Sequence, residues 1–179
     1  MVGLGWDEAP RKGGALFGLL KPADIDCDAS VILCDADGRL VSTEIHESCV
    51  YFGNLRHSSD AIIHYGDNLT GSGEGDSEKI MVDLQRVPPN IAKLVFVVNI
   101  YDAKARNQHF GMIENAFIRL VNMDNGNEIC RYDLSENYTS MTGMIVGELC
   151  RCANGWEFNA LGQPVQNASR LQSIIRLYE

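Results

Sequence analysis

The pattern of apolar and polar positions predicts strands rather than long helices. Short apolar runs recur along the chain, and Gly, Asn, Asp and Ser separate them. Residues 93–101, KLVFVVNIY, form a nearly continuous β-branched and aromatic run. Such a run is typical of a strand that is buried on both faces. We therefore expect this segment at the centre of the core.

Three Asx-Gly dipeptides between apolar segments predict β-hairpins. Asp37-Gly38, Asn125-Gly126 and Asn154-Gly155 each have the composition of a type I′ turn, which requires positive φ. The three predicted hairpins span residues 30–41, 117–134 and 144–161.

Helical patterning is limited to residues 102–108 and to a stripe near the C-terminus with Ser169 as its candidate N-cap. We expect that stripe to dock on the core rather than on a partner. Many short strands and few helices predict an all-β fold, a two-sheet antiparallel β-sandwich with a few short helices, in a single domain over residues 1–179. The stripe consists of Leu171, Ile174, Ile175 and Tyr178.

The formal net charge is −9, which favours cations over nucleic acid or anionic membrane surfaces. No apolar run approaches the length of about 18 residues that a membrane span needs, and residues 1–10 lack the features of a signal peptide. We expect a cytoplasmic protein without membrane insertion.

In the cytoplasm its six cysteines are expected to be reduced. Zinc binding by Cys150 and Cys152 is an alternative to a structural role for these two residues.

Residues 66–78, GDNLTGSGEGDSE, combine four carboxylates and four glycines with no cation. Two unit charges 4 Å apart repel by about 4 kcal/mol at an effective dielectric of about 20, so this loop is either splayed and solvated or holds a cation. The glycines allow backbone carbonyls to turn toward a hard ion. Side-chain oxygens come from Asp67, Asn68, Thr70, Asp76, Ser77 and Glu78.

A second acidic group alternates along the chain at Asp24, Asp26 and Asp28. An extended strand places these three carboxylates on one face, where they destabilise the strand unless they are neutralised. Beside the glycine-rich loop they would complete an oxygen-rich site for one or two divalent ions. The alternative is a solvated acidic edge that deters aggregation.

Oxygen ligands favour calcium over zinc or copper, and a flexible site with many carbonyls favours calcium over magnesium. The spacing is not that of an EF-hand, because Ala29 stands where that loop needs Gly. The glycines also lack the Lys-Ser/Thr of a phosphate-binding loop, so a directly bound nucleotide is disfavoured.

Several of these motifs together resemble the TerD family of tellurium-resistance and general stress proteins. They include VGLGWD (2–7), DIDCDAS (24–30), HYGDNLTGSGEGDSE (64–78) and KLVFVVNIYDAKARNQHFG (93–111). The resemblance implies a β-sandwich that binds calcium and a non-enzymatic role in bacterial stress resistance, beside membrane-embedded protein partners. The ligands that it implies are Asp26, Asp28, Asp67, Asn68, Gly71, Gly73, Asp76 and Glu78, with Asp24, Thr70, Ser77 and Asn115 as further candidates. Ser77 stands where the family usually has a second Asp.

Catalysis is not expected. His46 and Glu47 begin like a zincin helix but lack the second His, and no G-x-S-x-G occurs. His64 beside the loop either orients a ligand or is structural. The prediction is a calcium-binding stress protein in which the ion orders the acidic loop for a partner. The alternatives are a small-ligand or cyclic-nucleotide module that uses a bridging calcium ion, and a structural interaction protein with a solvated loop.

Overall fold

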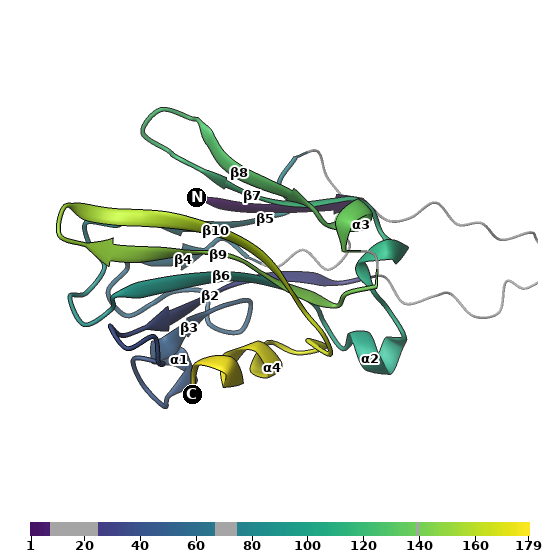
Figure 1. Ribbon diagram of the computed structural model, residues 1–179, viewed down its shortest axis with the longest axis horizontal. Helices are drawn as coiled ribbons and strands as arrows, with labels where there is room; N and C mark the ends of the chain where they lie inside the picture. Colours follow the sequence, from purple (N-terminus) through teal and green to yellow (C-terminus); the bar gives the residue numbers. More distant parts are fainter. Residues whose placement is uncertain (8–24, 67–74, 139) are drawn as a thin grey trace, which may run out of the picture.

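The computed structural model describes residues 1–7, 25–66, 75–138 and 140–179, which form two antiparallel five-stranded sheets packed face to face (Figure 1). The predicted all-β sandwich is confirmed. Sheet A has the order β4 (Ile62–His64), β5 (Glu78–Val82), β1 (Val2–Asp7), β7 (Glu114–Val121) and β8 (Glu128–Asp133). Sheet B has the order β10 (Gly155–Val165), β9 (Gly143–Cys152), β6 (Lys93–Ile100), β2 (Cys27–Cys34) and β3 (Cys49–Val50).

The helices are short and lie outside the two sheets. No helix in the described ranges is long and apolar enough to cross a bilayer. The α-helices are α1 (Ile45–Ser48), α2 (Ala103–Arg106), α3 (Leu134–Asn137) and α4 (Leu171–Ile175), and the 3₁₀ helices are η1 (Phe110–Met112) and η2 (Arg176–Tyr178).

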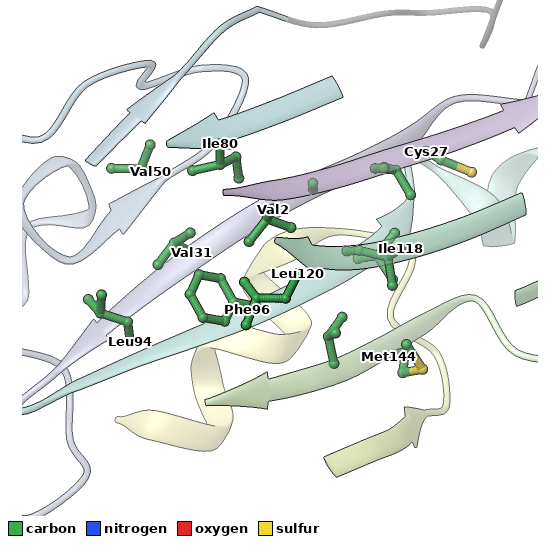
Figure 2. Close-up of a cluster of buried hydrophobic side chains, with 14 of the residues drawn as sticks. Val2, Cys27, Val31, Val50, Ile80, Leu94, Phe96, Ile118, Leu120 and Met144 are labelled. Carbon is green, nitrogen blue, oxygen red and sulfur yellow. The ribbon is translucent and has the colours of Figure 1, made fainter. Parts of the chain in front are cut away.

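The main core fills the space between the sheets, where side chains from alternate strand positions meet. Phe96 of β6 lies there beside Val31 and Leu120 (Figure 2). A second apolar cluster lies on the outer face of sheet B, which α4 covers (Figure 1). Because both faces are covered, β6 is buried along nearly its whole length, as its sequence predicts. The second cluster joins Ile32, Val95, Val97 and Ile145 to Leu171, Ile174 and Ile175.

Two of the three predicted hairpins are confirmed, β7–β8 and β9–β10. The first is present only in short form: after β2 the chain turns at Gly38 and pairs back through an antiparallel bridge between Cys34 and Leu40. The N–H of Val41 donates to the carbonyl of Leu33 at 3.2 Å, and the N–H of Asp35 donates to the carbonyl of Arg39 at 2.8 Å. In this register the N–H of Leu40 points away from β2, and it donates to the carbonyl of Tyr178 at 2.9 Å. The short hairpin is therefore tied to the C-terminal segment on its other side.

The turn type predicted for these sites is also wrong. Gly38, Gly126 and Gly155 have positive φ values of 78°, 73° and 128°, but the Asp or Asn that precedes each of them does not. A type I′ turn needs positive φ at both central residues. Only the glycine supplies the left-handed conformation in these three turns.

The C-terminal helix docks on the core as expected, but its predicted cap is wrong. Arg170 is the N-cap residue of α4 and makes no side-chain cap hydrogen bond. The carbonyl of Ser169 accepts a hydrogen bond from the N–H of Asp102 at 2.9 Å. Ser169 therefore joins the end of the chain to the segment after β6, and the helix begins two residues later.

All six cysteines are free thiols. Cys34 and Cys49 lie in the cluster on the outer face of sheet B. Burial raises the pKa of the Cys34 thiol to about 12 and also raises the pKa of Cys49. Cys152, at the end of β9, is exposed.

Candidate metal centre

Cys27, the first residue of β2, lies at one end of the core (Figure 2), and the charges of three predicted ligands act on its thiol. Burial raises the pKa of the Cys27 thiol, and the negative charges of Asp28, Glu78 and Asp26 raise it further. These three carboxylates are themselves buried, at 3%, 1% and 8% exposure. Members of the two acidic stretches therefore meet, although about 50 residues separate them in the chain.

Glu78 connects the two sheets. It points inward from β5, and its Oε2 accepts a hydrogen bond from the N–H of Ala29 in β2 at 2.9 Å. Nε2 of His64 lies 3.6 Å from the same oxygen. The N–H of Gly66 donates to Nδ1 of His64, so the proton of the neutral ring is on Nε2 and faces Glu78. At 3.6 Å the two groups face each other without a hydrogen bond, and Nε2 has no hydrogen-bond partner among the described residues.

Asp26 immediately precedes β2, and its carbonyl accepts a hydrogen bond from the N–H of Tyr101 at 2.8 Å. Its Oδ1 is buried and has no hydrogen-bond partner within the part of the chain that the structure describes. Burial and, to a smaller extent, the charge of Glu78 raise the pKa of Asp26 from 3.8 to about 6, against the opposing effect of Arg106. An ionised Asp26 therefore lacks sufficient positive charge nearby.

Asp76 lies elsewhere. Its carboxylate packs over Gly3 on the outer face of sheet A, where a Cβ at Gly3 would lie 2.4 Å from the Asp76 carboxyl carbon. Arg119 holds both oxygens, with Nε to Oδ1 at 2.8 Å and a terminal nitrogen to Oδ2 at 2.9 Å. Asp28, in contrast, is in register with Asn99 on the outer face of sheet B. The sandwich therefore separates Asp76 from Asp28.

The remaining predicted ligands divide into two groups. The N–H of Ser77 bonds to the carbonyl of Leu4, and Asn115, exposed on β7, donates from Nδ2 to Oδ2 of Asp7 at 2.8 Å. The others lie outside the described residues: Asp24, Asp67, Asn68, Thr70, Gly71 and Gly73.

The described residues supply only part of a coordination sphere. Within residues 1–7, 25–66, 75–138 and 140–179, no three His, Cys, Asp or Glu side chains lie close enough together to hold a metal ion. The partnerless Oδ1 of Asp26 beside Glu78 fits a hard cation, since burying an uncompensated charge is costly. Asp76 fits one poorly, because Arg119 neutralises it.

Asp26→Asn is expected to stabilise the protein at about pH 8 when divalent cations are absent, by roughly 1–2 kcal/mol after solvent screening. The folded-state pKa of Asp26 lies above its unfolded value, so the folded state holds more protons and stability falls as pH rises from 3.8 to about 6. Below that window both states are protonated and the substitution has little effect. Urea unfolding in chelator across this pH range measures the difference.

Asp124→Asn is the matched control, because it removes an exposed carboxylate from the turn between β7 and β8. It is expected to leave the pH profile unchanged. An Asp26→Asn profile that runs parallel to the wild-type profile would show that Asp26 has no raised pKa.

The structure thus defines the protein as an antiparallel β-sandwich of two five-stranded sheets with buried carboxylates at one end. The sequence matches the TerD domain over residues 1–178, and the chain belongs to this family.

Named relatives share much of the sequence. The chain is 47% identical over 180 residues to the stress response protein SCP2 of Bacillus subtilis (strain 168), covering 99% of this chain and 88% of the relative. It is 42% identical over 163 residues to the tellurium resistance protein TerD of Serratia marcescens, covering 91% of this chain and 79% of the relative.

The fold has also been seen in a crystal structure. A homologue of the telluride resistance protein TerD from Streptomyces coelicolor A3(2) superposes with a TM-score of 0.71 at 21% identity, over 93% of this chain and 89% of that one. At this identity the likeness supports the fold alone. The predicted family and its sandwich architecture are therefore confirmed.

Proposed function

We propose that this protein serves in resistance to tellurium compounds and related chemical stress by binding calcium at the end of the sandwich where Asp26 and Glu78 meet. The names of its relatives, a tellurium resistance protein and a stress response protein, support the cellular role. The observation that carries the metal proposal is the buried Oδ1 of Asp26, which has no partner among the described residues and lies in the field of Glu78.

Charge compensation explains why an ion stabilises this arrangement. Glu78 is fixed by Ala29 and faces His64, so it cannot move away from Asp26 without leaving a backbone N–H of β2 unsatisfied. A divalent cation between Asp26 and Glu78 removes their repulsion. The sequence offers the further oxygens that calcium requires within residues 67–74, which lie outside the described residues.

The partner surface follows from the same step. Ion binding would tie the loop of residues 66–78 to β2 and so fix one surface for a protein partner. We propose that this interaction takes place in the cytoplasm, with protein partners that are embedded in the membrane, and that nucleic acid is not a partner. Hydrogen exchange with and without calcium would locate the surface, with added protection expected at residues 25–28, 64–66 and 75–78.

Calcium is expected to raise the thermal stability of the protein. At about 100 times the Kd, mass action adds about 2.7 kcal/mol, which raises the melting temperature of a chain of this size by roughly 5–10 °C. Calorimetry with calcium and with magnesium, together with thermal melts in chelator, measures the effect. Magnesium is expected to bind more weakly.

Asp26→Asn is expected to abolish most of the calcium heat. Asp124→Asn is expected to retain it, because Asp124 belongs to the turn between β7 and β8, which lies at the opposite end of the sandwich from the start of β2 (Figure 1). No calcium heat and no melting shift at millimolar ion would end the proposal. Repeating the titration with a cyclic nucleotide in saturating calcium tests the small-ligand alternative.

A further inference from the structure

A pocket of about 250 Å³ lies on the outer face of sheet B, beside the start of α4. Asp28 and Ser30 of β2 and Asn99 of β6 line its floor. The next outward-facing residues along the same strands, Ile32 and Val97, belong to the apolar cluster under α4. The outer face of the sheet thus changes from apolar to polar where the pocket begins.

The floor contains buried polar atoms that the protein leaves unpaired. Ser30 and Asn99 are each 1% exposed. Oγ of Ser30 and Oδ1 of Asn99 have no hydrogen-bond partner among the described residues. A buried polar atom without a partner costs about 1–3 kcal/mol, so packing alone would favour apolar side chains here, as at Ile32 and Val97. The two atoms point to a ligand that donates hydrogen bonds.

The walls are mainly apolar and aromatic. Phe52 and Tyr101 stand edge to face with ring centroids 5.8 Å apart, and Leu171 contributes an aliphatic wall. Arg170 also lines the pocket, but its Nε donates to Oδ1 of Asp102 at 2.8 Å. The guanidinium of Arg170 is therefore paired with Asp102 and contributes little positive charge to the pocket. The carboxylate of Asp28 gives the floor its negative charge.

We propose that this pocket binds a small primary amine. A primary ammonium group has three N–H donors and no acceptor, which matches a floor of carboxylate, hydroxyl and amide oxygens at Asp28, Ser30 and Asn99. The carbon chain packs against the rings of Phe52 and Tyr101. The volume of the pocket suits a ligand smaller than most drugs. The negative charge of the protein attracts cations to it.

Three compounds with the same carbon chain and different head groups test the proposal: butylamine, 1-butanol and butyrate. In NMR titrations, butylamine is expected to shift the backbone amide signals of Ser30, Asn99 and Leu171 saturably. 1-Butanol is expected to bind at least about tenfold more weakly, a difference of about 1.4 kcal/mol, and butyrate is expected not to bind. Equal affinity for the amine and the alcohol, or no saturable shift by amine at about 20 mM, would overturn the proposal.

The titrations are run both in saturating calcium and in chelator. If the amine binds under both conditions, the pocket does not depend on calcium. The calcium proposal is then tested by the calcium titration alone. A different result would identify the floor as a metal site and refute the amine proposal. In that case calcium alone would shift the signals of Ser30 and Asn99 saturably and would block binding of the amine.

Substitutions in the floor complete the test. Ser30→Ala and Asn99→Leu are each expected to weaken amine binding by roughly fivefold or more, since each removes one acceptor. Gln85→Leu is the matched control and retains full affinity, because Gln85 is an exposed amide that does not line the pocket. Thermal melts show whether each variant is folded. If Asn99→Leu does not fold, Ser30→Ala, which removes a single oxygen, still tests the proposal. Unchanged affinity in a folded floor variant contradicts the proposal.

Discussion

Replacing Phe96 with alanine is expected to lower the free energy of unfolding by about 3–5 kcal/mol, far more than a typical surface substitution does. Phe96 is 1% exposed and fills the space between the sheets, next to Val31 across the strand pair (Figure 2). The loss combines burial of the ring with the cavity that alanine leaves. Equilibrium unfolding in urea measures it.

Phe52→Ala removes the same side chain from a position that is 38% exposed. It is expected to cost less than about 1.5 kcal/mol, mostly from its ring contacts with Tyr51 and Tyr101. Similar losses for the two variants would mean that the space between the sheets does not form the main core.

Arg119→Met is expected to destabilise the protein by about 3 kcal/mol, because it leaves the carboxylate of Asp76 buried without its cation. The Asp76 side chain is 2% exposed, and Arg119 makes two hydrogen bonds to it. Asp76→Asn in the Arg119→Met background is expected to recover much of this loss, since it removes the uncompensated charge. A double-mutant cycle from urea unfolding gives the coupling energy.

Arg56→Met is the control, because Arg56 pairs with Asp60 on the surface and exposed ion pairs contribute about 0.2–1 kcal/mol. The same cycle also tests the predicted role of Asp76 as a calcium ligand. A coupling energy near zero, together with loss of calcium heat in Asp76→Asn, would assign Asp76 to the metal rather than to Arg119.

Local sequence predicted the parts of the fold that local physics determines. The run at residues 93–101 became the central strand β6, and the glycines at positions 126 and 155 mark two real hairpins. The Ser169 cap failed because the carbonyl of Ser169 bonds to the N–H of Asp102, a distant segment, and such contacts depend on the assembled fold.

The candidate site was predictable in part. The expectation that the two acidic stretches meet agrees with the positions of Glu78 and Asp26. The pairing of Asp76 with Arg119 was missed, because it depends on the space that Gly3 leaves on the outer face of sheet A. The metal role of the whole ligand set stays a prediction.

The polar floor of the pocket did have a signal in the sequence. Ser30 interrupts the apolar run of residues 29–34 and Asn99 interrupts that of residues 93–101. Only the strand register places them on one face of the sheet, since Asp28 pairs with Asn99 across β2 and β6. Register between strands about 70 residues apart is not readable from either strand alone.

The buried thiols make the interior chemically durable. With the pKa of Cys34 at about 12, fewer than about one molecule in 10⁴ carries its reactive thiolate at neutral pH, and Cys49 is similarly protected. Electrophiles and oxidants reach Cys152 first, at a strand end where modification leaves the apolar cluster intact. The protein can thus lose a surface thiol and keep its fold.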